Sequence, residues 1–329
     1  MTILFAVFLL TMLVITAIAI VRTPDLFAAV MLLGIFSLLM AANFFVLDAA
    51  DVALTEAAVG AGISTVLFLG ALALTAARER SSLAPPRLAL VVVLITAATV
   101  VYATFDKPAL GDPNAPVHQH VAPWYLEQTP VLIGIPNVVT AVLGSFRGYD
   151  TLGEVFVVFA AAIGVLFVLS GDRPLSAVFR PKGAPSTGGL KHHLIPRIVG
   201  KLLIPFILLF GFYVQFHGEY GPGGGFQAGA IIAAAVILYA VLEGEDRALV
   251  ALPEPVLKGL VAGGALLYTA VGLVCMLLGG NFLEYSVLSA DAVFGQQLGI
   301  ILIEAGVGVA VTGVLLCIFH AFAARDNPA

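Results

Sequence analysis

An acidic residue, Glu56, lies within an apolar run that is long enough to cross a bilayer. Gly60 and Ser64 follow at offsets of four and eight, so a helix would place the three residues on one face. Because an ionised carboxyl group is costly in lipid, Glu56 needs a proton or a partner. A residue that passes on protons or binds Na+ has the same requirement. The alternatives are a neutral carboxylic acid that hydrogen-bonds to a neighbouring helix, or a Glu close enough to the external surface to contact water.

Glu304 repeats this pattern in the last apolar run of the chain. Gln297 precedes it by seven residues, and Gly308 and Thr312 follow it by four and eight, so the four again share a helical face. This face is predicted to contact protein. Glu304 is therefore a second candidate for an ion path. The alternative is that it fixes a contact between closely packed helices or subunits.

Two further groups of acids stand near the ends of apolar runs. Glu154 lies close to the start of one run, where an acid ordinarily caps a helix and interacts with its dipole. It is a third, weaker candidate for the ion path. Glu243, Glu245 and Asp246 follow a later run beside Arg247 and are predicted to form a solvated loop.

A glycine-rich hinge, residues 217–229, separates two apolar runs. Its consecutive glycines follow a proline, and this composition permits positive φ angles and close approach of backbones. His217 and Glu219 bring titratable groups to the membrane boundary, where they could relay protons. The hinge lacks the Lys-Ser/Thr ending of a phosphate-binding loop, so nucleotide binding is not expected. The candidate residues of this outer-face motif are His217, Glu219, Pro222, Gly223, Gly224, Gly225 and Gln227.

The composition indicates an integral membrane protein. Of the 329 residues, 60% are hydrophobic and only 11% are charged, and the mean hydropathy is +1.07. No basic run suggests nucleic acid as a partner, and the net charge of -5 says little because most charges must lie in loops. Cys275 and Cys317 both lie within apolar runs. We therefore expect no disulfide, no metal site and no cofactor.

The elements that must position these residues are transmembrane helices. Each apolar run has about the 17–25 residues that a helix needs to cross a bilayer, and no alternating pattern of a barrel is present. The predicted spans are 3–21, 26–47, 52–76, 88–105, 152–170, 196–216, 226–242, 255–278 and 297–322. The expected fold class is all-α integral membrane, with nine helices.

The distribution of positive charge predicts the orientation. With the N-terminus outside and the C-terminus inside, all but two of the 15 Lys and Arg residues lie on the cytoplasmic side. The two exceptions are Lys107 and Arg147. Both fall in a long external segment, 106–150, between spans four and five. Its residues 131–146 are predicted to form a half-buried or re-entrant piece that protein must cover.

Two polar linkers rich in proline and glycine, 81–87 and 180–189, divide the chain. The predicted modules are a three-helix module over 1–82, a two-helix module with the external segment over 83–180, and a four-helix module over 190–329. The modules show no clear internal repeat, so an inverted-repeat transporter made from this chain alone is not supported.

The hinge sequence, with Phe212-Tyr-Val-Gln-Phe216 before it, resembles the signature of the B subunit in the multisubunit Na+/H+ antiporter (Mrp) family. Residues 51–60 resemble the three-helix domain at the C-terminal end of the large antiporter subunit, which is a separate subunit in membrane-bound hydrogenases. Asn137-Val-Val-Thr140 and residues 146–154 resemble the module that follows it. The chain departs from the family in joining these modules to the B subunit. Residues 299–308 resemble the hydrogenase-type relatives more closely.

This resemblance implies a subunit related to the membrane arm of complex I, which works with other antiporter subunits in the cytoplasmic membrane of a prokaryote. Na+ and H+ are the expected transported ions, membrane lipid surrounds the chain, and Glu56 matches the acid implicated in the family's ion path. Two alternatives stay open. The chain could serve an ion-translocating hydrogenase or related redox complex, or it could be a structural subunit that conducts nothing.

Overall fold

The computed structural model describes residues 2–79, 86–109, 111–170 and 193–324. Within these ranges the regular structure is helical, and one isolated bridge joins Asp25 to Arg78. Nine helical spans in the described part of the chain are long and apolar enough to cross a membrane, as predicted. The predicted module boundaries near 82 and between 180 and 190 lie outside the described residues.

The spanning helices lie close to their predicted positions. The third span is continuous but changes type along its length, with a π-helical segment between two α-helical ones. The spans are α1 (Thr2–Arg22), α2 (Leu26–Val46), α3 (Ala50–Thr55) with η1 (Glu56–Ile63) and α4 (Ser64–Ala73), α5 (Pro86–Thr104), α9 (Gly148–Ser170), α10 (Leu194–His217), α11 (Gly225–Glu243), α13 (Glu254–Leu277) and α14 (Ala292–Ala323).

The last span begins five residues earlier than predicted. Asp291 ends the preceding loop, and its side chain accepts a hydrogen bond of 3.0 Å from the backbone N–H of Val293. This N-cap satisfies one of the free N–H groups of the first turn. The helix therefore starts at Ala292, and Gln297 lies in its second turn.

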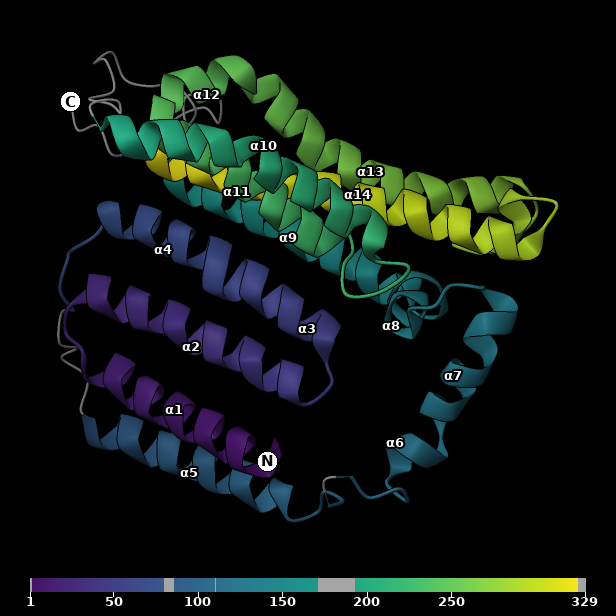
Figure 1. Cartoon of the computed structure of the whole chain (residues 1–329), viewed down its shortest axis with the longest axis horizontal. Coiled ribbons are helices and arrows are strands. Elements are labelled where there is room, and N and C mark those ends of the chain that lie inside the picture. The colour runs from purple at the N-terminus through teal and green to yellow at the C-terminus, as the bar shows by residue number, and fades with distance from the viewer. Residues whose placement is uncertain (1, 80–85, 110, 171–192, 325–329) are drawn as a thin grey trace.

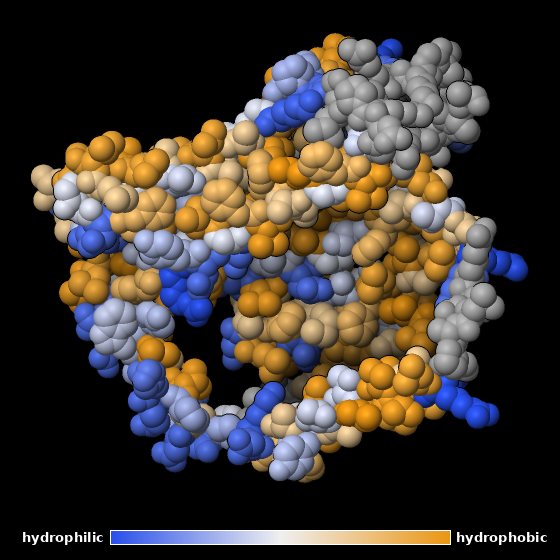
Figure 2. Space-filling model, turned by 180° about the vertical axis from the view of Figure 1, so that it is seen from behind, coloured by the Kyte–Doolittle hydropathy of each residue, from blue (hydrophilic) through white to orange (hydrophobic). Residues whose placement is uncertain are grey.

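The helices form two groups (Figure 1). Helices α9, α10, α11, α13 and α14 make a bundle, and α1 to α4 form a layer beside it. In this view α5 lies beyond α1, at the far edge. Helix α14 is the centre of the bundle. In its most apolar stretch of 18 residues, 67% of the residues are buried, whereas at most 17% are buried in the corresponding stretch of any of the first four spans. Seen from behind, much of the space-filling surface is apolar, and an opening lies between the layer and the segment that connects α5 to α9 (Figure 2).

Close helix packing explains why α14 can be so central. A Cβ atom on Gly264 of α13 would lie 2.4 Å from the backbone nitrogen of Ala310 in α14, so the two backbones nearly touch. Two buried tyrosines, Tyr268 of α13 and Tyr285 of the loop between α13 and α14, then join this part of the bundle to the start of α9 and to the segment before it. Tyr268 donates a hydrogen bond to the carbonyl of Gly148, and Tyr285 donates one to the carbonyl of Gly144.

The segment between α5 and α9 contains short helices, α6 (Pro116–Gln119), α7 (Val121–Leu132), α8 (Val138–Ala141) and η2 (Val142–Phe146). Ala141 is fully buried and Thr140 nearly so, and η2 packs on α14. The predicted half-buried piece is thus covered by protein. This arrangement satisfies backbone groups that lipid could not.

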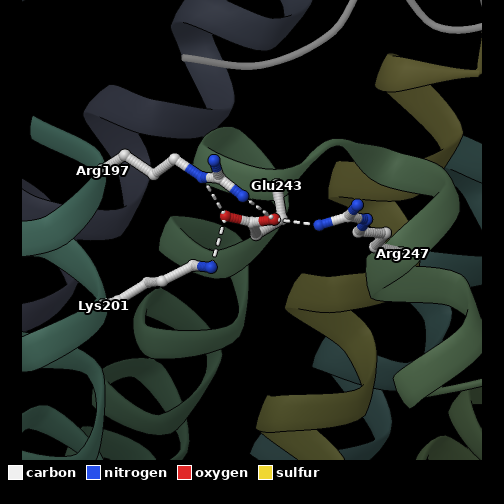
Figure 3. A network of polar contacts seen from close by, with 4 residues as sticks. All are labelled: Arg197, Lys201, Glu243 and Arg247. Carbon is white, nitrogen blue, oxygen red and sulfur yellow. Dashed lines mark hydrogen bonds and ion pairs between the residues drawn. The ribbon is translucent and has the colours of Figure 1, made fainter. Parts of the chain in front are cut away.

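The prediction of a solvated loop after α11 is wrong for Glu243. Its side chain is 1% exposed and accepts hydrogen bonds from Arg197 at 2.6 and 3.0 Å (Figure 3). Nζ of Lys201 lies 2.7 Å from Oε1 of Glu243. Arg247 of α12 (Glu245–Ala251) forms a third ion pair with the same carboxyl group. Sequence position alone could not show that two cations of α10 would face the end of α11.

Replacing Glu243 with Gln is expected to lower the unfolding temperature clearly, because three cationic side chains would lose their shared counter-charge. Glu254→Gln is the matched control. Its pair with Lys258 is an i,i+4 helix pair near the surface, a type worth only about 0.3–0.5 kcal/mol. Thermal unfolding of both detergent-purified variants measures the difference. Equal effects would show that the Glu243 cluster adds no more stability than the control pair does.

Candidate functional site

A cavity of about 580 Å³ lies where the three predicted modules meet. Its walls are mainly apolar, with side chains such as Val139, Leu143 and Phe226, but three carboxylic acids also line it. They are Asp51 of α3, Glu154 of α9 and Glu304 of α14. Each module therefore contributes one acid to a single space. Groups of acids within apolar walls are typical of ion pathways in membrane proteins.

The side chain of Glu304, which belongs to α14, reaches the N-terminus of α11. The backbone N–H of Gly225 donates a hydrogen bond to its Oε2 atom. The first N–H groups of a helix have no partner within the helix, and the helix dipole favours negative charge there. This contact stabilises a carboxylate in the middle of the bundle.

The glycines of the hinge make this contact possible. Gly224 has a φ of 126°, a backbone conformation that residues with a Cβ rarely adopt. A Cβ on Gly225 would lie 2.2 Å from the backbone oxygen of Glu304 and 2.8 Å from the nitrogen of Gly308. The hinge thus presses the start of α11 directly against α14. Its role in close packing between helices follows from these distances.

A second, smaller cavity of about 80 Å³ is also lined by Glu304. Glu219 of the hinge lines it, together with Thr140 and Gln215. The Oε1 atom of Glu219 is enclosed and has no hydrogen-bond partner among the described residues. Burial raises the pKa of this carboxyl group. Glu304 and Thr140 line both cavities.

Asn137 joins all three modules. Its Nδ2 atom lies 3.1 Å from Oδ1 of Asp51, 3.0 Å from the carbonyl of Gly218 and 2.9 Å from that of Gly221. Its backbone N–H donates to the carbonyl of Glu219 at 3.0 Å. An amide nitrogen has two hydrogens, so the three acceptors share them. Asn137 therefore holds the hinge and Asp51 in place together.

Asn137→Ala is expected to destabilise the protein by about 2–3 kcal/mol, since it leaves buried acceptors without donors. Asn281→Ala is the control, because Asn281 is exposed and its side chain donates a hydrogen bond to the nearby Glu284. Limited proteolysis and thermal unfolding of the two variants test this. A stability of Asn137→Ala equal to that of the control would contradict the anchoring role.

The structure distributes the predicted site residues unevenly. Glu154 and Glu304 line the large cavity together, as do Gly223, Gly224 and Gln227 of the hinge. The side chain of Gln227 also donates a 2.6 Å hydrogen bond to Thr55 and so ties α11 to the first module.

His217, by contrast, lines neither cavity. Its ring stacks on that of Tyr213, with the two ring centroids 4.9 Å apart. Pro222 is likewise outside both walls.

Glu56 lies outside both cavities as well. It begins η1, and one of its carboxyl oxygens lies 2.5 Å from the place where a Cβ of Gly60 would be, with Ser37 of α2 at 3.0 Å from the same point. Glu56 and Gly60 thus share a face, as predicted. Ser64 is part-buried at the start of α4. The prediction placed Ser64 on the face of Glu56 by counting α-helical turns. Hydrogen bonds in the π-helical η1 run from i to i+5, so this α-helical spacing is not kept between Glu56 and Ser64.

Sequence reasoning missed Asp51 as a site residue. It stands in the first turn of α3, where an acid is ordinarily explained by the helix dipole. The available signal was its position five residues before Glu56 at the same end of the span. Among the described residues, no group of three or more His, Cys, Asp or Glu side chains could hold a metal ion.

The fold and the site define a polytopic helical membrane protein with carboxyl groups in the spaces between its helices. Three family descriptions match successive parts of it: the D subunit of MBH over residues 11–77, the E subunit of MBH over 87–182, and a domain related to the MnhB subunit of Na+/H+ antiporter over 195–317. The putative antiporter subunit mnhB2 of Staphylococcus aureus is 33% identical over 131 residues, which cover 39% of this chain and 92% of that protein. The chain belongs to the MnhB family of antiporter subunits, with MBH-like modules fused before the MnhB-related part. The predicted resemblance is confirmed.

Other relatives are longer than the matched regions. An uncharacterized protein of Methanocaldococcus jannaschii is 31% identical over 175 residues, or 50% of this chain and 66% of that protein. A probable A/B subunit of a K+/H+ antiporter from Rhizobium meliloti is 28% identical over 138 residues, or 37% of this chain and 14% of that protein. The matches therefore span only part of each of these two relatives.

Two solved structures resemble the chain. The first is a structure of the Mrp complex from a Dietzia species, with a TM-score of 0.74 and 25% identity, covering 96% of this chain and 34% of that chain. The second is an archaeal respiratory membrane complex, the membrane-bound sulfane sulfur reductase. It has a TM-score of 0.53 and 28% identity, covering 71% of this chain and 97% of that chain.

Proposed function

We propose that this chain is a membrane component of a multisubunit antiporter that exchanges a monovalent cation, Na+, for protons. The observation that carries the proposal is the large cavity, to which Asp51, Glu154 and Glu304 bring one carboxyl group from each module. Acids that share an apolar space can hold a cation or a proton in turn, which is the chemistry that exchange requires. The chain contributes to the ion path and is a transporter subunit with no enzymatic activity of its own.

Two of the similar proteins support this proposal, because they are antiporter components by name. The Staphylococcus aureus relative is a putative antiporter subunit, and the structure covering nearly all of this chain is that of an Mrp complex. The working protein is an assembly with other antiporter subunits in the cytoplasmic membrane of a prokaryote. Helix α5 fits such an assembly, because its side chains such as Leu88, Val93 and Tyr102 are all exposed and the apolar ones need lipid or a partner.

Reconstitution tests the proposal. The complex is purified through a tag on this chain, placed in vesicles with a pH-sensitive dye inside, and given a Na+ gradient. Na+-driven proton movement is expected, and a complex assembled without this chain should show none. Exchange that is undiminished without the chain would refute a role in antiport.

A redox complex is the second candidate function. Two observations favour it: the MBH descriptions of the first two modules, and the sulfane sulfur reductase chain, of which 97% is covered. Metal analysis of the partners that co-purify with the chain separates the candidates. Iron–sulfur or nickel centres in the partners would favour the redox complex, and their absence together with Na+/H+ exchange would favour the antiporter. A complex that exchanges ions normally when all three acids of the large cavity are neutralised would make this chain a structural subunit.

A further inference from the structure

Three cations surround a single carboxyl group at the end of α11. Oε1 of Glu243 is contacted by Arg197 at 2.6 Å and by Lys201 at 2.7 Å, and Oε2 is contacted by Arg197 at 3.0 Å and by Arg247 (Figure 3). A carboxylate has about four acceptor sites, so these contacts fill them. An arginine has five N–H groups and a lysine has three, so the cations have more donors than Glu243 can accept.

The cations are open to the surroundings although the carboxyl group is not. The side chain of Glu243 is 1% exposed, whereas those of Arg197, Lys201 and Arg247 are 31%, 45% and 57% exposed. Glu243 therefore holds the cations from the protein side and leaves part of each side chain accessible. An anion from outside the protein can reach all three.

The neighbouring acids leave an excess of positive charge beside Glu243. Glu245 of α12 is turned toward α14, where its Oε1 atom lies 3.5 Å from Nδ1 of the buried His320. Asp246 is exposed on α12 and lowers the positive charge of the surroundings by one. Three cations against Glu243 and Asp246 still leave one positive charge in excess.

An exposed apolar stripe runs along α10 beside these cations. Its members recur every three or four positions, so they lie on one face of the helix, and each is more than half exposed. The stripe consists of Ile195, Ile198, Leu202, Phe206 and Leu209. From its first residue to its last it extends over about 21 Å, at 1.5 Å per residue, which exceeds the roughly 15 Å depth of one leaflet of a bilayer.

Arg197 and Lys201 lie between this stripe and the face of α10 that packs on α11. Gly200 marks the packed face, because a Cβ there would lie 2.5 Å from Cδ1 of Leu242 in α11. The distribution of positive charge predicts that this end of α10 is cytoplasmic. The cations then lie at the depth of the phosphate groups of the inner leaflet, where basic pockets between helices bind anionic head groups.

We propose that Arg197, Lys201 and Arg247 together bind the phosphate group of one anionic phospholipid, whose acyl chains lie along the apolar stripe of α10. Phosphate oxygens accept hydrogen bonds from the fork of a guanidinium group and from an ammonium group. A single lipid molecule meets both features of the surface, since its charged and apolar ends are joined as the cations and the stripe are. A lipid such as phosphatidylcholine carries a positive group beside its phosphate, which the excess of positive charge repels.

Photo-crosslinking of the purified complex tests the site. The probe is phosphatidylglycerol with a photoreactive diazirine in one acyl chain, and mass spectrometry of the digested chain locates the label. We expect label within residues 194–209, and we expect unlabelled phosphatidylglycerol to displace it while phosphatidylcholine and inorganic phosphate do not. Absence of label from this segment, as when another subunit covers α10, would overturn the proposal. Displacement by inorganic phosphate or an equal effect of phosphatidylcholine would overturn it too.

Lys201→Gln and Lys258→Gln form a matched pair of variants. Their side chains are 45% and 44% exposed, but Lys258 is paired with Glu254 and lies outside the cluster. One cation near a membrane surface contributes about 1 kcal/mol, so Lys201→Gln should weaken binding of the probe about fivefold. Lys258→Gln should bind the probe as the unchanged complex does. Equal affinities in the two variants would refute the role of the cluster.

The double variant Lys201→Gln/Arg247→Gln removes the excess charge and leaves Arg197 bonded to Glu243 through two contacts. The buried carboxyl group keeps a partner, and labelling of α10 should fall by more than tenfold. Size-exclusion chromatography checks that each variant complex assembles, and Lys201→Gln decides the question if the double variant does not. Undiminished labelling of an assembled double variant would overturn the site. The ion path is separate from this surface, so that result would leave the antiporter proposal standing.

Discussion

Gly225→Ala is expected to separate α11 from α14 and to destabilise the protein strongly. The added methyl carbon would lie 2.2 Å from the backbone oxygen of Glu304 and 2.8 Å from Cβ of Val307. Backbone atoms cannot rotate away as a side chain can, so one helix must move. We expect a loss at or above the upper end of the roughly 1–3 kcal/mol that overpacking usually costs. The displaced N–H of residue 225 would also no longer reach Glu304.

Gly259→Ala is the matched control for this prediction. Gly259 lies in α13, and nothing is within 4 Å of the place where its Cβ would be. Alanine in a helix is about 1 kcal/mol more favourable than glycine, so this variant should be as stable as the original or more stable. Fluorescence-detected size-exclusion chromatography after heating compares the two. Equal thermal stability would mean that the contact between the hinge and α14 is not tight.

The second large effect is expected from Glu304→Gln. The amide keeps the size of the side chain and an oxygen that can accept from Gly225, but it cannot ionise. Because Glu304 is the acid shared by both cavities, Na+-driven proton movement in vesicles should fall to the background of protein-free vesicles. The stability should change little, which separates this variant from Gly225→Ala.

Glu56→Gln, measured in the same vesicles, compares the two candidate routes. Glu56 was the leading candidate in the sequence, and it lies beside Ser37 and outside both cavities. If ions pass through the cavities, Glu56→Gln should keep most of the exchange. Normal exchange in Glu304→Gln together with loss in Glu56→Gln would place the path along η1 instead.

The spans were predictable because the bilayer imposes a simple rule. A helix must be apolar for about 20 residues, and any run of that kind in the sequence reports it directly. The start of α14 was less predictable, because the N-cap made by Asp291 adds turns outside the most apolar region. The buried Glu243 was not predictable, because its partners Arg197 and Lys201 belong to another helix.

The sequence by itself predicted a helical membrane protein with nine spans, the number found in the described part of the chain, and it showed which residues carry charge and which family the motifs resemble. These properties are local, since each depends on one run of residues. Only the tertiary structure decided which acids share a space. Asp51, Glu154 and Glu304 are far apart in the chain and meet because the glycines of the hinge let α11 touch α14, and because Asn137 joins the modules. Contacts between helices depend on packing in three dimensions, which hydropathy does not record.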